Sequence, residues 1–266
     1  MLVNGREIAE DVLSTLEKER ASVGRTLALG ILMSQGDAAT ESFIRIKSKA
    51  AHRLGVEVIR RELAETSTTE DAIAALQELA AITQGLIVQL PLPPSIDAEA
   101  VIATIPNNKD VDALGPKPHE VLAPVAAATL EILERAGVST KGKKAVIIGA
   151  GRLVGKPVAE MLTEMGANIV FVTEHAGSLD ELFDADIAIL GAGKPGFIKP
   201  AMLKPGVVLI DAGTSEAAGG KLVGDADASC ANMASVFTPV PGGVGPIAIA
   251  MIFKNLFALA KKHETH

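Results

Sequence analysis

Short aliphatic runs alternate along the chain with longer segments in which apolar and polar residues recur at helical spacing. The aliphatic runs predict strands at Leu27–Met33, Val56–Arg60, Gly85–Leu90, Lys144–Gly149, Asn168–Thr173, Ile187–Leu190 and Val207–Asp211. Most are continuously apolar, as in parallel strands covered on both faces. The amphipathic segments predict helices at Gly5–Glu19, Thr40–Leu54, Thr69–Ala81, Pro118–Ala136, Val154–Met165 and Pro246–Lys262. This alternation predicts the α/β fold class with parallel sheets.

The pattern changes character near residue 140, where a second α/β unit begins. Residues 136–149 read AGVSTKGKKAVIIG, which is typical of a helix end, a polar link and the first strand of a mononucleotide-binding unit. We therefore predict two domains, an N-terminal α/β domain and a Rossmann-type nucleotide-binding domain. On periodicity alone, the last helix can pack on either of them.

Composition narrows the classes of partner. The net charge of −7, the pI near 5.3 and the lack of Trp and Tyr argue against nucleic acid, because binding it needs clustered cations and stacking platforms. Cys230 is the only cysteine, so we expect no disulfide within the chain and no metal site. The N-terminus turns charged early and no apolar run approaches the ~20 residues of a membrane span. We expect a cytoplasmic protein with a small-molecule partner and no membrane contact.

A glycine-rich turn follows the strand that opens the second domain. The turn Gly149-Ala150-Gly151-Arg152-Leu153-Val154-Gly155 leads into a helix, the order in which backbone N–H groups and a helix N-terminus meet a pyrophosphate. A tight strand-to-helix turn without a ligand is the alternative. The predicted cofactor-binding residues here are Gly149, Gly151, Arg152, Leu153 and Gly155.

Glu174 ends the next strand, about twenty residues beyond these glycines. A carboxylate there accepts hydrogen bonds from the adenosine ribose of NAD and repels the 2′-phosphate of NADP, so NAD is the preferred cofactor and NADP the alternative. The competing interpretation is a solvated loop acid. Arg152 or His175 would attract a phosphate.

One lysine of the helix at Thr40–Leu54 lies among apolar positions. Phe43, Ile46, Ala50 and Leu54 form an apolar stripe, and Lys47 falls inside it. Burial lowers the pKa of a lysine, so Lys47 is a candidate for proton exchange near neutral pH. The alternative is a lysine whose stem is buried and whose amine reaches solvent.

Three further segments carry polar or unusual backbone chemistry. Gln89 ends an apolar strand, where a side chain contacts a ligand or caps the loop backbone. Lys109–Asp112 places two acids in a loop, where such acids are usually structural or solvated. Thr238–Pro246 is rich in Pro and Gly, which predicts a shaped backbone wall with room for a cis proline.

Together these segments resemble the bifunctional methylenetetrahydrofolate dehydrogenase/cyclohydrolase family, the FolD type. The resemblance runs over nearly the whole chain and is carried by ordered motifs. They are VQLPLP at Val88–Pro93, KDVD at Lys109–Asp112, VGKP at Val154–Pro157, GDAD at Gly224–Asp227 and TPVPGGVGP at Thr238–Pro246.

The resemblance implies a fold and a site. Residues 1–138 with 246–266 would form the folate-binding catalytic domain and 139–245 the NAD(P)-binding domain, with folate in the cleft, and the protein would be a homodimer. Lys47 matches the catalytic lysine, Gln89 its hydrogen-bonding partner and Asp112 the acid that contacts the pterin. The implied substrate-binding residues are Phe43, Pro241, Gly242 and Gly243.

The chain departs from the family pattern at several positions. Phe43 stands where the family has Tyr, so the phenol hydroxyl is missing. The nucleotide turn lacks the usual Gly-Arg-Ser, and Val172-Thr173-Glu174 replaces Cys-His-Ser. Relatives use that Arg and Ser for the NADP 2′-phosphate, so their loss favours NAD. The glycine after KDVD is Ala113, and Pro124–Ala127 replaces a proline-cysteine-threonine-proline segment.

The implied activity is oxidation of 5,10-methylenetetrahydrofolate with a nicotinamide cofactor, followed by hydrolysis of the methenyl product to 10-formyltetrahydrofolate with Lys47 as general base. The missing phenol predicts a slow rather than absent second step. One alternative is a non-catalytic folate- or nucleotide-binding relative. Another is a dehydrogenase of the amino-acid or shikimate type, which leaves VQLPLP unexplained.

Overall fold

The structure is a computed structural model that describes residues 1–35, 38–217 and 221–263, without the side chains of residues 38–43, 216, 217 and 221. The chain divides into two compact units, which we name by their main sheets. The five-stranded unit comprises Met1–Ala9 and Val125–Ala248, and the three-stranded unit comprises Glu10–Pro124 and Ile249–His266. Both main sheets are parallel, so the predicted α/β class is confirmed.

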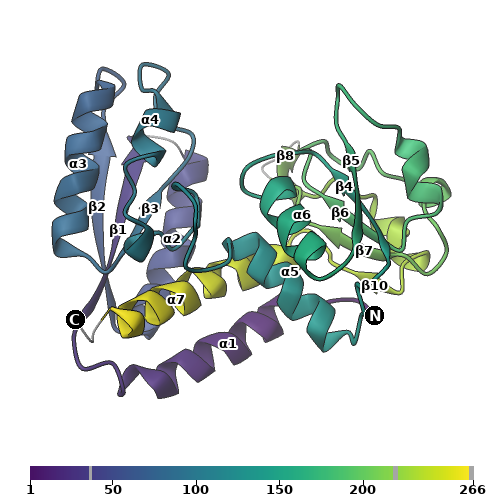
Figure 1. The fold of residues 1–266 in the computed structure, drawn as a ribbon, viewed down its shortest axis with the longest axis horizontal. Coiled ribbons are helices and arrows are strands. Elements are labelled where there is room, and N and C mark those ends of the chain that lie inside the picture. The colour runs from purple at the N-terminus through teal and green to yellow at the C-terminus, as the bar shows by residue number, and fades with distance from the viewer. Residues whose placement is uncertain (36–37, 218–220, 264–266) are drawn as a thin grey trace. The chain divides into compact units, whose positions relative to one another are not determined.

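The three-stranded unit is built on a sheet with the strand order β2-β1-β3. Its elements are most of α1 (Gly5–Arg20), β1 (Leu27–Ser34), α2 (Ala38–Arg53), β2 (Val56–Leu63), α3 (Thr69–Ile82), β3 (Gly85–Val88), α4 (Ala98–Ile102), the 3-10 helix η1 (Asn107–Lys109) and most of α7 (Val244–Lys262). The connections through α2 and α3 cross the sheet in opposite directions. Because such crossovers are right-handed, α2 and α3 cover opposite faces (Figure 1).

Local sequence sets the boundaries of these elements. Helix α3 begins at Thr69 because Thr68 and Asp71 form a capping box, with Thr68 Oγ1 accepting from Asp71 N at 3.2 Å and Asp71 Oδ2 accepting from Thr68 N at 2.9 Å. Its leucines Leu76 and Leu79 are buried in one cluster with Leu86 of β3. The apolar face of α3 therefore anchors the sheet.

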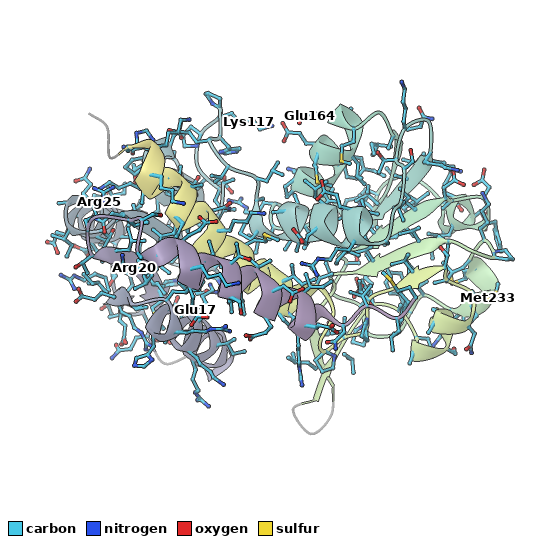
Figure 2. All side chains as sticks on the ribbon, turned by 90° about the horizontal axis from the view of Figure 1, so that it is seen from below. Glu17, Arg20, Arg25, Lys117, Glu164 and Met233 are labelled. Atoms are coloured by element: carbon cyan, nitrogen blue, oxygen red, sulfur yellow. The ribbon has the colours of Figure 1, made fainter. Side chains whose placement is uncertain are left out.

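Two arginines, labelled in Figure 2, fix the link between α1 and β1. Arg20 Nη1 donates to the carbonyl of Val23 at 3.1 Å, and Arg25 Nη2 donates to the carbonyl of Ala260 at 3.0 Å. Because Ala260 lies near the end of α7, that helix is tied to the residues just before β1.

The five-stranded unit has the strand order β10-β7-β6-β4-β5. Its elements are α5 (Pro124–Arg135), β4 (Lys144–Ile148), α6 (Gly155–Glu164), β5 (Asn168–Val172), η2 (Leu179–Phe183), β6 (Ile187–Leu190), η3 (Pro200–Met202), β7 (Val208–Asp211), the hairpin β8 (Ser215–Ala217) and β9 (Lys221–Val223), η4 (Ala228–Asn232) and β10 (Val236–Phe237). The strand order reverses between β4 and β6. In open α/β sheets a ligand binds beyond the carboxyl ends of the strands at such a switch point.

The first residues of the chain extend this sheet beside β10. Val3 N donates to the carbonyl of Phe237 at 2.8 Å, and Phe237 N donates to the carbonyl of Met1 at 2.9 Å. Gly5 N donates to the carbonyl of Gly242 at 2.9 Å. The N-terminal segment therefore packs with the proline- and glycine-rich wall. The division of the chain into domains at residues 139 and 245 stays a prediction.

Several predicted boundaries were wrong. The helix expected from Pro118 begins at Pro124, because Leu122 before it presents its carbonyl to Asn255 of α7 instead of joining a helix. Strand β2 runs on to Leu63, since its full length pairs with β1 despite two arginines. The short elements α4, β8, β9 and β10 and the 3-10 helices were not predicted from the sequence pattern.

Helix α7 corrects the expectation that no apolar run has the length of a membrane span. It has 19 residues with a mean hydropathy of 1.5 and meets the length and composition of such a span. However, 61% of this stretch is buried inside the protein. The pattern is that of a core helix, with Phe253 and Phe257 fully buried.

Candidate active site

Lys47 lies on the buried face of α2. Its side chain is 8% exposed, between Ile44 and Ala51, which are both fully buried. Ile46, which the sequence analysis placed in the apolar stripe, is 50% exposed. The buried face passes through residue 44 rather than residue 46, since three- and four-residue steps from Lys47 lead to Ile44 and Ala51. The prediction for Ile46 was wrong, whereas the burial of Lys47 is confirmed.

The side chain of Lys47 is buried, and its amine meets a side chain from the end of β3. Lys47 Nζ donates to Gln89 Oε1 at 2.7 Å, and Gln89 Nε2 donates to the carbonyl of Leu90 at 3.2 Å. Gln89 N donates to the carbonyl of Leu32 on β1 at 2.8 Å, which extends the β-ladder by one residue. The carboxamide is therefore both a partner of the amine and a cap on the loop backbone.

In the KDVD segment, two residues hold the loop in place and a third is available to a substrate. Lys109 Nζ donates to the carbonyls of Ala80 and Thr83 at the end of α3, and Asp110 Oδ2 accepts from Gly115 N at 2.7 Å. Residue 110 also bridges to Leu86 of β3. Lys109 and Asp110 thus hold the loop, and Asp112 is the acid presented beside Lys47.

Asn255 was missed by the sequence analysis. This buried residue of α7 donates from Nδ2 to the carbonyls of Val111 and Leu122, both at 2.8 Å. It thereby holds the loop that carries Asp112. The only signal in the sequence is a polar residue in a mostly apolar helix, and that pattern does not say what the residue binds.

Burial sets the charge state of the pair formed by Lys47 and Asp112. Burial lowers the pKa of Lys47, and the charge of Asp112 opposes this shift. Burial raises the pKa of Asp112 to about 6, against the opposing charge of Lys47. The low polarity around both groups favours their uncharged forms. An amine held by a neutral carboxamide keeps its lone pair when unprotonated and can therefore act as a general base.

The predicted substrate-binding residues fall in two places. The side chain of Phe43 on α2 lies outside the described part of the chain. Pro241 and Gly242 belong to the five-stranded unit, where with Asn4 and Arg6 they line a hollow of about 400 Å³. The Val240–Pro241 bond is cis, so the expectation of a cis proline is confirmed.

Gly243 and Gly5 explain why this wall requires glycine. A Cβ on Gly5 would stand 1.8 Å from the carbonyl oxygen of Gly243, and one on Gly243 would stand 2.6 Å from that of Pro239. The start of α1 and the wall are packed backbone to backbone.

The glycine turn after β4 has the geometry of a pyrophosphate site. Gly149 has a φ of +92°, and a Cβ on Gly155 would stand 1.9 Å from the Gly149 carbonyl oxygen. No described atom beyond its chain neighbours lies within 4 Å of a Cβ position on Gly151. Val154, the N-cap residue of α6, makes no side-chain cap hydrogen bond. Gly149 and Gly155 close the turn, while Gly151, just before the start of α6, leaves room for an anion.

Glu174 lies just beyond β5 and is paired rather than free. Lys194 Nζ lies 2.6 Å from Glu174 Oε1, and the Lys194 ammonium lowers the pKa of Glu174. Leu153 is 47% exposed and Arg152 is exposed at the same edge of the sheet. The predicted cofactor residues therefore gather around one sheet edge, and Lys194 joins them as a residue that the sequence analysis missed.

Two buried acids, Asp211 and Asp225, hold the loops at this edge of the sheet. Asp225 accepts from the backbone N–H groups of Ala192, Gly193 and Lys194 at 2.7, 3.2 and 2.7 Å. Asp211 accepts from Gly213 N and Ala226 N at 3.0 and 2.8 Å. Burial and the charge of Asp225 raise the pKa of Asp211 to about 6. These acids shape the loops after β6 and β7.

Other chemistry-bearing groups lie away from these sites. Cys230 is fully buried and burial raises its pKa to about 11, so its thiol is inert. Among the described residues, no three His, Cys, Asp or Glu side chains come together as a metal site.

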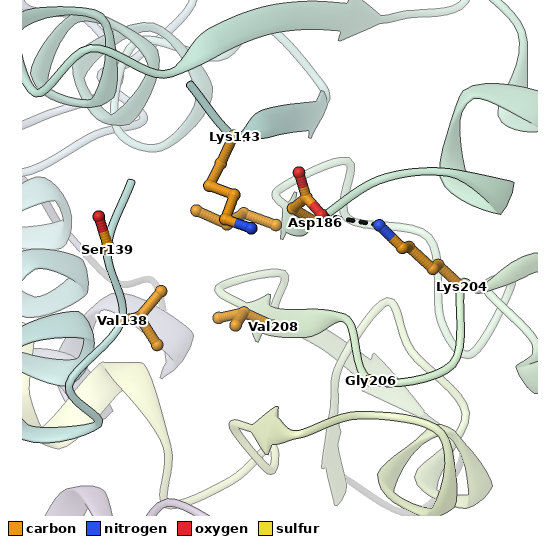
Figure 3. Close-up of a pocket in the computed structure, with 8 residues that line it drawn as sticks. Val138, Ser139, Lys143, Asp186, Lys204, Gly206 and Val208 are labelled. Carbon is orange, nitrogen blue, oxygen red and sulfur yellow. Dashed lines mark hydrogen bonds and ion pairs between the residues drawn. The ribbon is translucent and has the colours of Figure 1, made fainter. Parts of the chain in front are cut away.

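A hollow of about 150 Å³ lies at the amino ends of β4, β6 and β7, the opposite edge to the glycine turn. Figure 3 shows Lys143 and Lys204 both directed at Asp186, whose Oδ1 lies 2.7 Å from Lys204 Nζ. The carboxylate already neutralises Lys204, and ligands of such sheets bind at the other edge. We assign this hollow no role.

Two family models match successive parts of the chain. The family model of the tetrahydrofolate dehydrogenase/cyclohydrolase catalytic domain matches residues 3–112, and that of the NAD(P)-binding domain matches residues 123–264. The bifunctional protein FolD of Acetivibrio thermocellus is 34% identical over 275 residues, which cover 98% of this chain and 96% of that protein.

Solved structures show the same fold over the whole chain. The bifunctional FolD enzyme of Campylobacter jejuni has a TM-score of 0.94 at 29% identity, covering 98% of this chain and 99% of the other. The FolD enzyme of Trypanosoma brucei, complexed with NADP cofactor and inhibitor, has a TM-score of 0.93 at 30% identity, covering 100% and 99%. The chain belongs to the tetrahydrofolate dehydrogenase/cyclohydrolase family.

Proposed function

We propose that this chain oxidises 5,10-methylenetetrahydrofolate to the methenyl form with a nicotinamide cofactor and then hydrolyses that product to 10-formyltetrahydrofolate. The observation that carries the proposal is the hydrogen bond of 2.7 Å between the buried Lys47 amine and Gln89, in the part of the chain that matches the family's catalytic domain. The FolD relatives are bifunctional.

Lys47 acts in the hydrolytic step. Unprotonated, it accepts a proton from the water that attacks the methenyl carbon, while Gln89 holds the amine in place. In the oxidation no proton moves, and a neutral Lys47 avoids placing a positive charge beside the cationic product. The lowered pKa of Lys47 serves both steps.

Asp112 and Phe43 complete the proposed folate site. Asp112, with a pKa raised to about 6, hydrogen-bonds the pterin in either protonation state. Position 43 holds Phe, which offers a ring without a hydroxyl to orient Lys47 or water. The hydrolysis is therefore slow rather than absent. Pro241, Gly242 and Gly243 contribute the backbone wall for the substrate.

The nicotinamide cofactor supplies the hydride acceptor when it is bound. Gly149, Gly151 and Gly155 let the turn and the start of α6 hold its pyrophosphate, with Arg152 and Leu153 beside it. NAD is the preferred cofactor, because the Glu174 carboxylate suits ribose hydroxyls and repels a 2′-phosphate. NADP is the alternative.

Assays of both half-reactions test the function. We expect reduced nicotinamide to form with methylenetetrahydrofolate and a higher kcat/KM with NAD than with NADP, followed by slower loss of the methenyl absorbance. If calorimetry shows that NAD or folate binds but no reduced nicotinamide forms in the assay, the chain is instead a non-catalytic relative. A much higher kcat/KM with NADP would reverse the cofactor preference alone.

Three further expectations belong to the same proposal. The catalytic domain comprises residues 1–138 and 246–266, and the nucleotide domain residues 139–245. The protein is a homodimer and acts in the cytoplasm. The single cysteine supports the last point, since a reducing compartment gives no use for disulfides.

A further inference from the structure

An ion pair crosses the glycine turn at the edge where the cofactor is proposed to bind. Glu174 follows β5 and Lys194 follows β6, and in the sheet β4 lies between these two strands. The contact of 2.6 Å between Lys194 Nζ and Glu174 Oε1 therefore spans the carboxyl end of β4, where the turn Gly149–Gly155 begins.

The backbone of Lys194 is fixed while its side chain is accessible. Asp225, which is fully buried, accepts from Lys194 N at 2.7 Å and from the two preceding residues. The side chains of Lys194 and Glu174 are 52% and 68% exposed. An exposed ion pair contributes little to stability, so a ligand can rearrange it readily.

We propose that Lys194 is a phosphate-binding residue that allows this chain to accept NADP as a second cofactor, while Glu174 selects NAD. This rests on the proposed dinucleotide-binding function. A ribose 2′-hydroxyl donates to the Glu174 carboxylate. A ribose 2′-phosphate at the same place meets the ammonium of Lys194, which leaves Glu174 and donates to the phosphate oxygens.

Binding of reduced cofactors tests this assignment without requiring turnover. The chain has no Trp or Tyr, so the fluorescence of NADH and NADPH can be followed with little protein background. We expect Lys194→Gln to weaken NADPH binding ~10-fold, the value of one charge-assisted hydrogen bond, and to leave NADH binding within ~2-fold. Glu174→Gln should strengthen NADPH binding and weaken NADH binding.

Lys199→Gln is the matched control. Lys199 is 54% exposed and pairs with Asp227 at 3.0 Å, so it resembles Lys194 in exposure and pairing. It should leave the affinities for both cofactors unchanged. Added salt should reduce the effect of Lys194→Gln on NADPH, because it screens exposed charges.

Three outcomes would overturn the role of Lys194. In the first, Lys194→Gln leaves the NADPH affinity unchanged. In the second, it weakens the binding of NADH and NADPH equally, which would mean that Lys194 contacts a group that both cofactors share. In the third, Arg152→Gln weakens NADPH binding selectively while Lys194→Gln does not. If the wild type binds neither cofactor, the dinucleotide function fails as well; if it binds both, only this inference is at stake.

Discussion

At the scale of single residues, the chemistry depends on whether the Lys47 amine carries a proton. Gln89 offers it a neutral acceptor at 2.7 Å, which positions the amine without favouring its charged form. Asp112 acts in the opposite sense, because its negative charge raises the pKa that burial lowers. The balance between burial and one carboxylate therefore sets the pH range in which Lys47 is a base.

Replacing Lys47 separates the two half-reactions. Lys47→Gln should lower the hydrolysis rate by about 10²–10⁴-fold, the usual contribution of a general base, and affect the oxidation far less. Both rates are measured by absorbance. Lys49→Gln, on the exposed side of the same helix, is the control and should match the wild type. Equal losses in both steps would assign Lys47 to substrate binding.

Removing the charge of Asp112 should move the pH profile of hydrolysis. The rate at saturating substrate rises with pH as Lys47 loses its proton. In Asp112→Asn the pKa of Lys47 falls further, because the carboxylate that raised it is gone. The rising limb should shift to lower pH, and the ionisation of Asp112 near pH 6 should disappear from it. If the rising limb of the pH profile stays in place or moves to higher pH, the charge of Asp112 does not raise the pKa of Lys47.

At the scale of elements, each proposed site lies where strands end. Gln89 follows β3, and the glycine turn, Glu174 and Lys194 follow β4, β5 and β6. Within each sheet the carboxyl ends of the parallel strands share one edge, so residues far apart in the chain, such as Glu174 and Lys194, become neighbours.

Two glycines of the turn should respond differently to the same added methyl group. Gly155→Ala forces its Cβ to 1.9 Å from a backbone carbonyl, which should lower stability by about 1–3 kcal/mol and abolish NADH binding. Gly151→Ala meets open space, so it should melt like the wild type yet bind NADH more weakly. Thermal melts and fluorescence titration check both. If Gly155→Ala binds NADH normally, the glycine turn is not part of the cofactor site.

Asn255 connects α7 to the loop that carries Asp112. In Asn255→Leu the buried carbonyl of Val111 and the partly buried carbonyl of Leu122 lose their donor, so the free energy of unfolding should fall by about 1–3 kcal/mol and hydrolysis should weaken. Denaturant unfolding followed by circular dichroism measures the first effect. Ala258→Gln, at an exposed position of the same helix, serves as the control. An unchanged midpoint would mean that these bonds contribute nothing to stability.

At the scale of the whole molecule, we expect two copies of the chain to associate. Sedimentation equilibrium should give twice the chain mass of 27.4 kDa at micromolar concentrations. A single chain mass at every concentration, in an active preparation, would contradict the proposed homodimer and leave the chemistry of Lys47 untouched.

The sequence by itself determined the α/β class, most strands to within a residue or two, the glycine turn and the place of Lys47 among apolar helix positions. These features depend on local pattern, namely aliphatic runs and three- and four-residue spacing, and such patterns are visible in one segment at a time. Ile46 was predicted to be buried but is exposed, which shows the limit of periodicity. A helix with several apolar residues has more than one face that could be buried.

Only the tertiary structure decided which side chains meet. Lys109 caps a helix that ends 27 residues earlier, at Ile82, Asn255 holds a loop 144 residues away, and Lys194 pairs with Glu174 from another loop. Nothing in the neighbourhood of these residues in the sequence encodes their partners. The partners are fixed by the order in which strands assemble into a sheet, and that order is a property of the packed chain as a whole.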